Sequence, residues 1–160
     1  MLSDYSNLER EIAEAPEPKM LPKGKEVKAR IIAVRGGISD KNNAQWYQPV
    51  FDIPDEPLAL EFNDFFWDLA DRDKLDDKAR ARALRKFRMF ADAFGIDYTE
   101  PFSWEDDLLG EEGWVILGVR KSEEYGDQNT VQKYVSGRVP SRRTTTVTQS
   151  ERDSDDEVPF

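Results

Sequence analysis

The side chains that can act on a ligand are aromatic and charged, because the chain contains no cysteine and no histidine. This composition excludes disulfides, thiolate or imidazole metal sites, and catalysis that depends on either residue type. The chemistry that remains is stacking on aromatic rings, neutralisation of anions by lysine and arginine, and Mg²⁺ binding by carboxylates. Aromatic faces beside a row of cations are typical of surfaces that bind single-stranded nucleic acid.

Three aromatic side chains are candidates for stacking on a base. Trp46 alternates with the apolar Tyr47 in a predicted strand, so we expect Trp46 to point away from the core. By the same alternation, Tyr134 is expected to point away from Val131, and Tyr125 belongs to a loop that contains a turn signal. The alternative for each ring is a partly buried packing position.

Basic residues are concentrated in two stretches although the net charge is −10. They outnumber acids in residues 19–48 and again in 114–143, whereas 52–113 and the segment from 144 onward are acidic. If the fold brings the two basic stretches together, one face becomes basic, and such a local field steers a polyanion. The candidates for phosphate contact are Lys28, Arg30, Arg35, Lys41, Arg120, Lys121 and Arg138.

The pattern of apolar residues predicts three strands, one long helix and two further strands. The predicted strands cover residues 26–35, 45–53, 58–69, 114–121 and 130–139. A helical stripe predicts a helix over 73–94 that ends at Gly95, with Phe65 and Trp67 packed beneath it and a solvated basic outer face. This order is that of the OB-fold, a five-stranded Greek-key barrel with its helix between strands three and four. The two basic stretches then fall in the hairpins that form the binding loops of that fold.

The last six residues combine acids with an apolar end: Asp155, Asp156, Glu157, Val158, Pro159 and Phe160. Phe160 carries both a ring and the terminal carboxylate, a pair that suits a shallow apolar pocket rimmed by Arg or Lys on a partner. The segment resembles the C-terminal tip of bacterial single-stranded DNA-binding proteins, which end in a run of Asp, a small apolar residue, Pro and Phe. Glu157 and Val158 depart from that pattern but keep charge and branching, so the departure bears on affinity. The alternative is a frayed terminus.

A second resemblance covers residues 20–139, which look like small phage-encoded OB-fold proteins found among replication and recombination genes. It is carried by Pro22-Lys23-Gly24, by Leu109-Gly110, and by the hairpin from Tyr125-Gly126 to Val131-Gln132-Lys133-Tyr134. Together the two resemblances imply a phage single-stranded DNA-binding protein that coats strands during DNA replication, recombination and repair, without strong sequence preference. They also imply that the tip recruits a polymerase, a helicase or primase, or a recombinase, in the cytoplasm of the bacterial host.

The expected organisation is an N-terminal arm over 1–18, the OB-fold domain over 19–140, a flexible linker over 141–153 and an acidic interaction tip over 154–160. The linker is Ser/Thr-rich and has no apolar period. No apolar run reaches the length of a membrane span, so no membrane partner is expected. We expect no cofactor, no metal and no enzymatic activity, and the resemblance leaves self-association open.

Two other classes of function remain open at this point. The net charge of −10 and the peptide-like tail are also compatible with an acidic adaptor, or a DNA mimic that inhibits a host protein and binds no strand. A Mg²⁺-dependent nuclease would use the acids before the fourth strand, although acidic loops are mostly solvated surface and no Lys or His partner is suitably spaced. Those acids are Glu105, Asp106, Asp107, Glu111 and Glu112.

Overall fold

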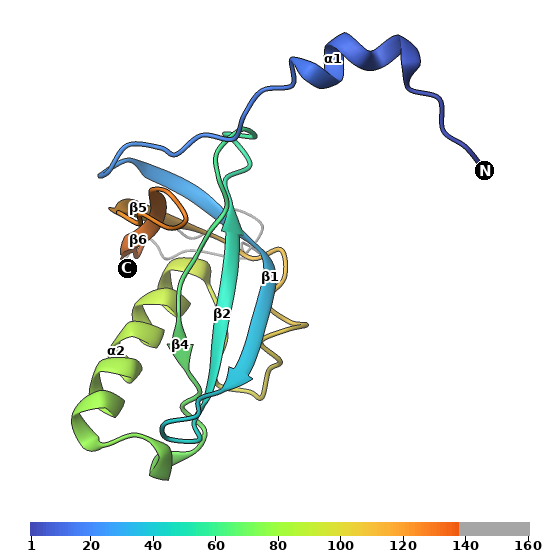
Figure 1. The fold of residues 1–160 in the computed structure, drawn as a ribbon. Helices are drawn as coiled ribbons and strands as arrows, with labels where there is room; N and C mark the ends of the chain where they lie inside the picture. The colour runs from blue at the N-terminus through green and yellow to red at the C-terminus, as the bar shows by residue number, and fades with distance from the viewer. Residues whose placement is uncertain (138–160) are drawn as a thin grey trace.

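The structure, a computed structural model, describes residues 1–137 and is mainly antiparallel β-sheet with few helices (Figure 1). Arg138, the predicted linker and the predicted tip lie outside the described residues. The elements are η1 Ser6–Leu8, α1 Glu9–Ala13, β1 Glu26–Ile38, β2 Gln45–Asp52, β3 Phe62–Asn63, β4 Phe66–Trp67, η2 Arg72–Lys74, α2 Asp77–Phe94, β5 Glu112–Arg120 and β6 Gln128–Val135. The expected third strand is thus two short pieces, and α2 begins four residues later than the sequence predicts.

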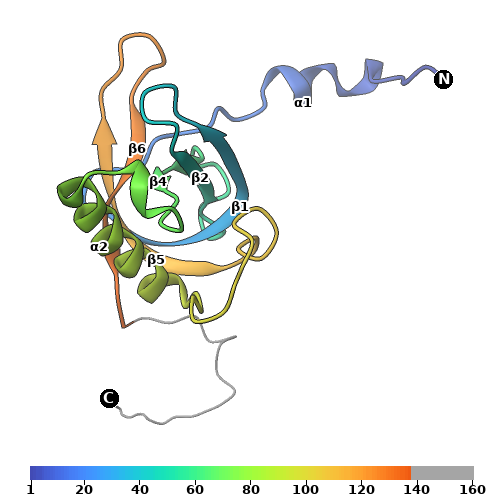
Figure 2. The same cartoon turned by 90° about the horizontal axis from the view of Figure 1, so that it is seen from below.

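The sheet is organised around β1, the longest strand. Residues 26–30 of β1 pair with β5 and residues 30–38 pair with β2, both in the antiparallel sense. The strand order is β3-β2-β1-β5-β6, and β4 also pairs with β2. Because β3 also contacts β6, the two ends of the sheet meet and the sheet curls into a barrel-like form (Figure 2).

The core lies between the curled sheet and α2. The largest fully buried side chains include Ile31, Phe51, Phe90, Phe94, Val115 and Leu117. The helix begins where the Asp76 side chain accepts a hydrogen bond from the Ala79 N–H at 2.8 Å, and it ends at Gly95 with φ 64°. The last turn of α2 packs against Gly113 in β5. A Cβ at this position would lie 2.7 Å from the Ala93 carbonyl oxygen, so only glycine fits. Burying each phenylalanine contributes about 1.5–3 kcal/mol to stability.

Two extra residues interrupt the pairing of the strands, and each reverses the alternation of side chains beyond it. In β6 the extra residue is Gln132, and in β1 it is Ile32. Val131 and Tyr134, three residues apart, therefore both pack on the core, and Tyr134 is only 5% exposed. The prediction that Tyr134 points outward was wrong, because it assumed unbroken alternation through β6.

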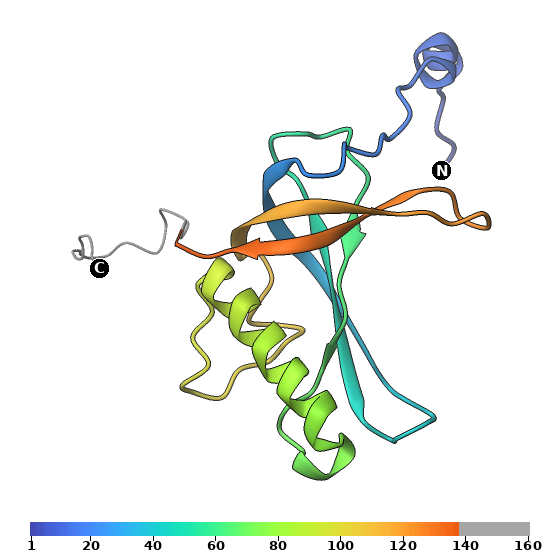
Figure 3. The same ribbon diagram turned by 90° about the vertical axis from the view of Figure 1, so that its left-hand side faces the viewer.

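The N-terminal arm joins the body of the protein at Lys19, which forms an isolated parallel bridge with Ala59 in the segment between β2 and β3. The next anchor is Asn129, a buried side chain that accepts from the Leu21 N–H and donates to the Leu21 carbonyl oxygen, each at 2.9 Å. Every residue from 1 to 19 is exposed. In all three views α1 projects from the body on the side away from α2 (Figures 1, 2 and 3).

Candidate nucleic-acid interface

Three aromatic side chains gather on the outer face of β2 and β4. Trp46 pairs with Trp67 across the two strands, and Phe65 contacts both rings. The Phe65 ring stacks on Trp46 with centroids 5.7 Å apart, and it meets Trp67 edge-on at 4.9 Å. Phe65 is 38% exposed and both tryptophans are half-buried, so parts of all three rings reach solvent. We call Trp46, Phe65 and Trp67 the aromatic strip.

Gly37 in β1 determines where the Trp46 indole lies. The two residues pair across the strands, and an ideal Cβ at Gly37 would stand 2.6 Å from Cζ2 of the indole. The indole therefore packs on the β1 backbone at a place that only glycine leaves free. Held by Gly37 and by Phe65, the ring is ordered before any ligand arrives, which lowers the entropy lost on binding.

A polar network beneath the strip turns Phe65 outward. Asp64 accepts a hydrogen bond from the Tyr134 hydroxyl at 2.6 Å and another from Lys86 Nζ at 2.8 Å, and Lys86 also donates to the Phe65 carbonyl oxygen. Burial, aided by the negative charge of Asp64, raises the pKa of the Tyr134 phenol well above its ordinary value, so the hydroxyl stays a donor. Because Asp64 is held inward, the residue that follows it points to the outer face.

Polar side chains continue the strip toward β1 and β3. Arg35 lies opposite Gln48, two residues along β2 from Trp46, and Gln48 Nε2 donates to Asn63 Oδ1 at 3.1 Å. Arg35 is exposed and forms no ion pair with any of residues 1–137. An exposed guanidinium without an internal partner can bind an anion such as a phosphate.

The hairpins that carry the other predicted cations project to the same side of the sheet (Figures 2 and 3). Lys41 is exposed in the β1–β2 loop, and Tyr125 is exposed in the β5–β6 loop. Across their own hairpin, Arg120 donates to Gln128 Oε1 at 2.8 Å and Lys121 forms an ion pair with Asp127 at 3.3 Å, and both cations remain exposed. The structure therefore brings the hairpin cations to one side of the molecule.

Lys28 and Arg30 do not join that set. They lie on the half of β1 that pairs with β5, where Lys28 is opposite Trp114. Arg30 Nε and Nη2 both donate to the Asp52 carboxylate, at 3.1 and 2.7 Å, and these bonds raise the pKa of the guanidinium. Two hydrogen bonds hold the Arg30 guanidinium on a carboxylate, whereas Lys121 has one longer contact with Asp127, so Arg30 is the least available of the described phosphate candidates.

Phe65 and Trp67 are the residues that sequence reasoning missed as ligand contacts. They border the first turns of α2 rather than lying beneath it, and together with Arg82 and Lys86 they line a hollow of about 230 Å³. A second hollow of about 330 Å³, between α2 and β6, adds Lys133 to this basic surface. The signal for the strip was present in the sequence, since the segment that forms β3 and β4 has large apolar side chains on both faces.

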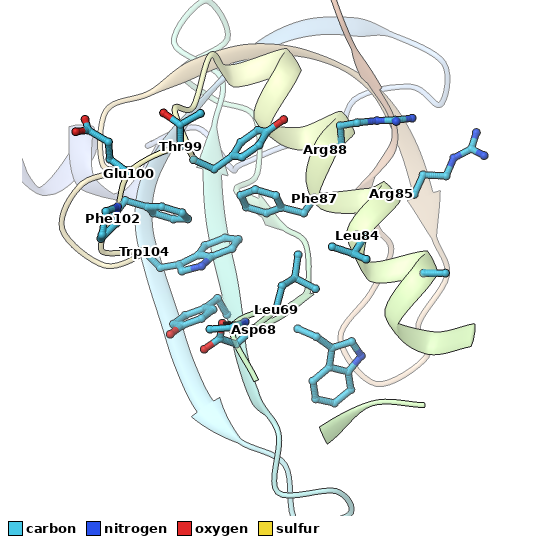
Figure 4. A pocket seen from close by; sticks show the side chains of 16 residues that line it. Asp68, Leu69, Leu84, Arg85, Phe87, Arg88, Thr99, Glu100, Phe102 and Trp104 are labelled. Carbon is cyan, nitrogen blue, oxygen red and sulfur yellow. Dashed lines mark hydrogen bonds between the residues drawn. The ribbon is translucent and has the colours of Figure 1, made fainter. Parts of the chain in front are cut away.

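A larger apolar groove of about 1000 Å³ runs along another side of α2 (Figure 4). Its floor is the Trp104 indole, which stacks on Tyr47 at 4.8 Å and on Phe90 at 5.9 Å between ring centroids. Figure 4 shows the rings of Phe87, Phe102 and Trp104 gathered at its centre. We call it the α2 groove, and the apolar residues that line it include Leu69, Leu84, Phe87, Tyr98, Phe102 and Trp104.

The acids before β5 belong to a turn. Asp107 accepts from the Ser103 N–H at 2.8 Å, and Asp106 accepts from the Ser103 hydroxyl at 3.4 Å. Within residues 1–137, no three acidic, histidine or cysteine side chains gather closely enough to hold a metal ion. No helix in the same part of the chain is long and apolar enough to cross a membrane.

A scan of the chain against protein-family models found no match, and a search of curated proteins found none either.

Proposed function

We propose that the protein binds single-stranded DNA through an OB-fold. The pairing of the strands supports this fold. β1 pairs with both β2 and β5, β5 pairs with β6, and β6 contacts β3, with α2 inserted between β4 and β5. In OB-folds the face of the second and third strands, together with the β1–β2 and last hairpin loops, binds oligonucleotides. The aromatic strip occupies that face.

The observation that carries the proposal is the strip itself, a row of three ordered and partly exposed rings beside exposed cations. A base that stacks on such a ring gains about 1–3 kcal/mol, whatever the base. Arg35 and Lys41 on one hairpin, and Arg120 and Lys121 on the other, are placed to neutralise phosphates on either side of the stacked bases. A duplex hides the faces of its bases, so the same surface discriminates against it.

The overall charge of −10 does not oppose this reading, because a local field steers a polyanion more than the total charge does. We propose that the protein coats strands during phage DNA replication, recombination and repair, and that residues 154–160 recruit enzymes acting on DNA. That role of the tip rests on its sequence alone, since those residues lie outside the described part of the chain.

The test is a titration of the intrinsic tryptophan fluorescence with oligo-dT and with a duplex of the same length, at two salt concentrations. Trp46 and Trp67 lie in the strip, so we expect single strands to quench the emission and duplexes to leave it nearly unchanged. The affinity should fall as salt rises, because bound cations are released from the strand.

A Phe65→Ala variant should lose most of this binding, whereas Tyr98→Ala, an exposed aromatic change in the α2 groove, should keep it. Equal binding of strands and duplexes would reject the strip as a stacking surface. No binding of either would leave the acidic adaptor or DNA mimic as the better account of the charge.

A further inference from the structure

Three basic residues beside the aromatic strip have no ion-pair partner in the described part of the chain. Arg82 and Arg85 are three residues apart in α2, so they lie on one face of the helix, with about 4.5 Å of axial rise between them. Lys133 lines the same hollow from β6. All three residues are exposed, and none forms an ion pair with any of residues 1–137. We call Arg82, Arg85 and Lys133 the basic row.

The basic row begins at the edge of the aromatic strip. Arg82 lines the hollow of about 230 Å³ together with Phe65 and Trp67. It also lines the hollow of about 330 Å³ together with Arg85 and Lys133. The two hollows therefore meet at Arg82. A chain molecule that leaves the rings of the strip can continue through the first hollow into the second.

The negative charge in these hollows is already neutralised. Of the described residues that line them, Asp64 is the one acid, and it accepts hydrogen bonds from the Tyr134 hydroxyl and from Lys86 Nζ. Lys86 is held in place further by its hydrogen bond to the Phe65 carbonyl oxygen. Lys86 therefore offsets the charge of Asp64, and the positive charge that remains for a ligand is that of the basic row.

We propose that a single strand of DNA leaves the aromatic strip across α2, with its phosphates on Arg82, Arg85 and Lys133. This inference rests on the proposed function, and it adds a path for the strand that neither hairpin provides. The ring that lines the second hollow, Tyr134, is only 5% exposed, so the basic row contacts the backbone of the strand and not its bases. Contacts of this kind are independent of sequence and weaken as salt rises.

The rings beside the basic row favour a single strand over other polyanions. An isolated row of cations would suit any polyanion, but this row starts where Phe65 and Trp67 present their rings. A polyanion that also carries flat bases for stacking is a single-stranded nucleic acid. A duplex hides the faces of its bases, and a free anion such as inorganic phosphate needs only one of the cations.

The experiment compares the salt dependence of binding for oligo-dT of about 4 and about 16 nucleotides, the limits of the site size of one OB fold. The short strand occupies the strip, whereas the long one also reaches the basic row. For the long strand, Arg82→Gln with Lys133→Gln should lower the slope of the logarithm of affinity against the logarithm of salt concentration. The decrease should be about 1.4, twice the value of about 0.7 for one phosphate contact. The slope for the short strand should not change. Arg85 is left in place because it also lines the α2 groove.

A matched control removes the same charge elsewhere. Arg10→Gln with Lys23→Gln also replaces one arginine and one lysine, both exposed, and neither residue lines the two hollows or the α2 groove. The control should keep the wild-type slopes for both strands. Both double variants change exposed side chains, so circular dichroism should show the wild-type fold in each.

The outcomes separate this inference from the proposed function. Phe65→Ala should weaken the binding of both strands, because both occupy the strip. If it does so while Arg82→Gln with Lys133→Gln keeps the wild-type slope for the long strand, the path across α2 is wrong and the strip remains the binding surface. Equal decreases in the double variant and its control would mean that only net charge matters, which also overturns the path. A wild type that binds neither strand overturns the proposed function and the path together.

Discussion

The aromatic strip and the α2 groove are both lined by aromatic side chains that are at least partly accessible at the surface, yet they differ in what lies behind the rings. Phe65 stands on the outer face of a sheet, and its neighbours are other surface rings and polar side chains. Trp104 is sandwiched between Tyr47 and Phe90 and belongs to the core cluster. The strip can therefore offer ring faces to a ligand without weakening the fold, whereas the groove is the exposed margin of the core.

This difference separates two kinds of recognition. A base needs a ring face with a cation nearby, and its polar edges tolerate water. An apolar helix needs a continuous surface from which water is excluded, and it gains chiefly from buried area. The number of accessible aromatic rings would not distinguish these two surfaces. They differ in whether the rings also pack in the hydrophobic core.

The largest expected effect is on stability, at the floor of the groove. Replacing Trp104 by alanine removes a buried indole from an aromatic stack, so we expect a loss of about 3–5 kcal/mol in the free energy of unfolding. Phe65→Ala, on the partly exposed strip, should cost about 1 kcal/mol or less by the same urea denaturation. Equal losses of unfolding free energy at the two sites would contradict the view that Trp104 belongs to the core and Phe65 to the surface.

The next effect concerns the network beneath the strip. Tyr134→Phe removes the hydroxyl that donates to Asp64 and should cost about 1.5–3 kcal/mol, since the lost bond is to a charged group. The folded state raises the pKa of Tyr134, so the folded protein holds this proton more tightly than the unfolded chain does. The contribution of the protonated Tyr134 to the free energy of unfolding is therefore complete below pH about 10, and it is lost as the pH rises further. Urea midpoints between pH 8 and pH 11 should show a steeper alkaline loss in the wild type than in the variant.

A third prediction sharpens the role of the strip in binding. Phe65→Ala should weaken oligo-dT binding about 5- to 150-fold, the equivalent of 1–3 kcal/mol for one stacked base. Phe65→Trp should keep the affinity, because it keeps a ring face. Leu84→Ala, in the groove, should leave the affinity for a short oligonucleotide as it is. Fluorescence anisotropy measures all three.

The smallest effect is on salt dependence. Arg35→Ala should lower the slope of the logarithm of affinity against the logarithm of salt concentration by about 0.7, the value for one phosphate contact on a single strand. Arg30→Ala should leave that slope unchanged, because Asp52 already holds the Arg30 guanidinium at 2.7 Å. The reverse result would show that the strand follows the first half of β1 and not the hairpins.

The order of elements could be predicted from the sequence because each has an unambiguous local signal. Alternation identified the strands, and the apolar stripe with Gly95 at its end identified α2. The interrupted third strand could not be predicted, because Asp64 looks like any polar outward position. Its role depends on Tyr134, 70 residues further along, and on Lys86. Contacts between residues so far apart in the sequence do not change the local pattern of apolar residues, so that pattern cannot predict them.

The candidate site was predicted less well, for related reasons. Trp46 lies on the outer face that its alternation predicts, whereas Tyr134 does not, because the extra residue Gln132 precedes it. A bulge of this kind depends on the partner strand and cannot be read from β6 alone. The charge of Arg30 suggests a phosphate contact, but nothing in the local pattern of residues shows that Asp52 lies opposite it. The positions of the hairpin cations were easier to predict, because the sequence already places these residues in or beside the two hairpin loops.

Trp67 belongs to both surfaces: it contacts Phe65 in the strip, and it lines the α2 groove. If either ligand shifts this ring, the two binding equilibria are thermodynamically linked. The factor by which a ligand in the α2 groove changes the affinity of the strip for its own ligand must then equal the factor by which the ligand of the strip changes affinity in the groove. A single indole would thereby couple the occupancy of one surface to the affinity of the other.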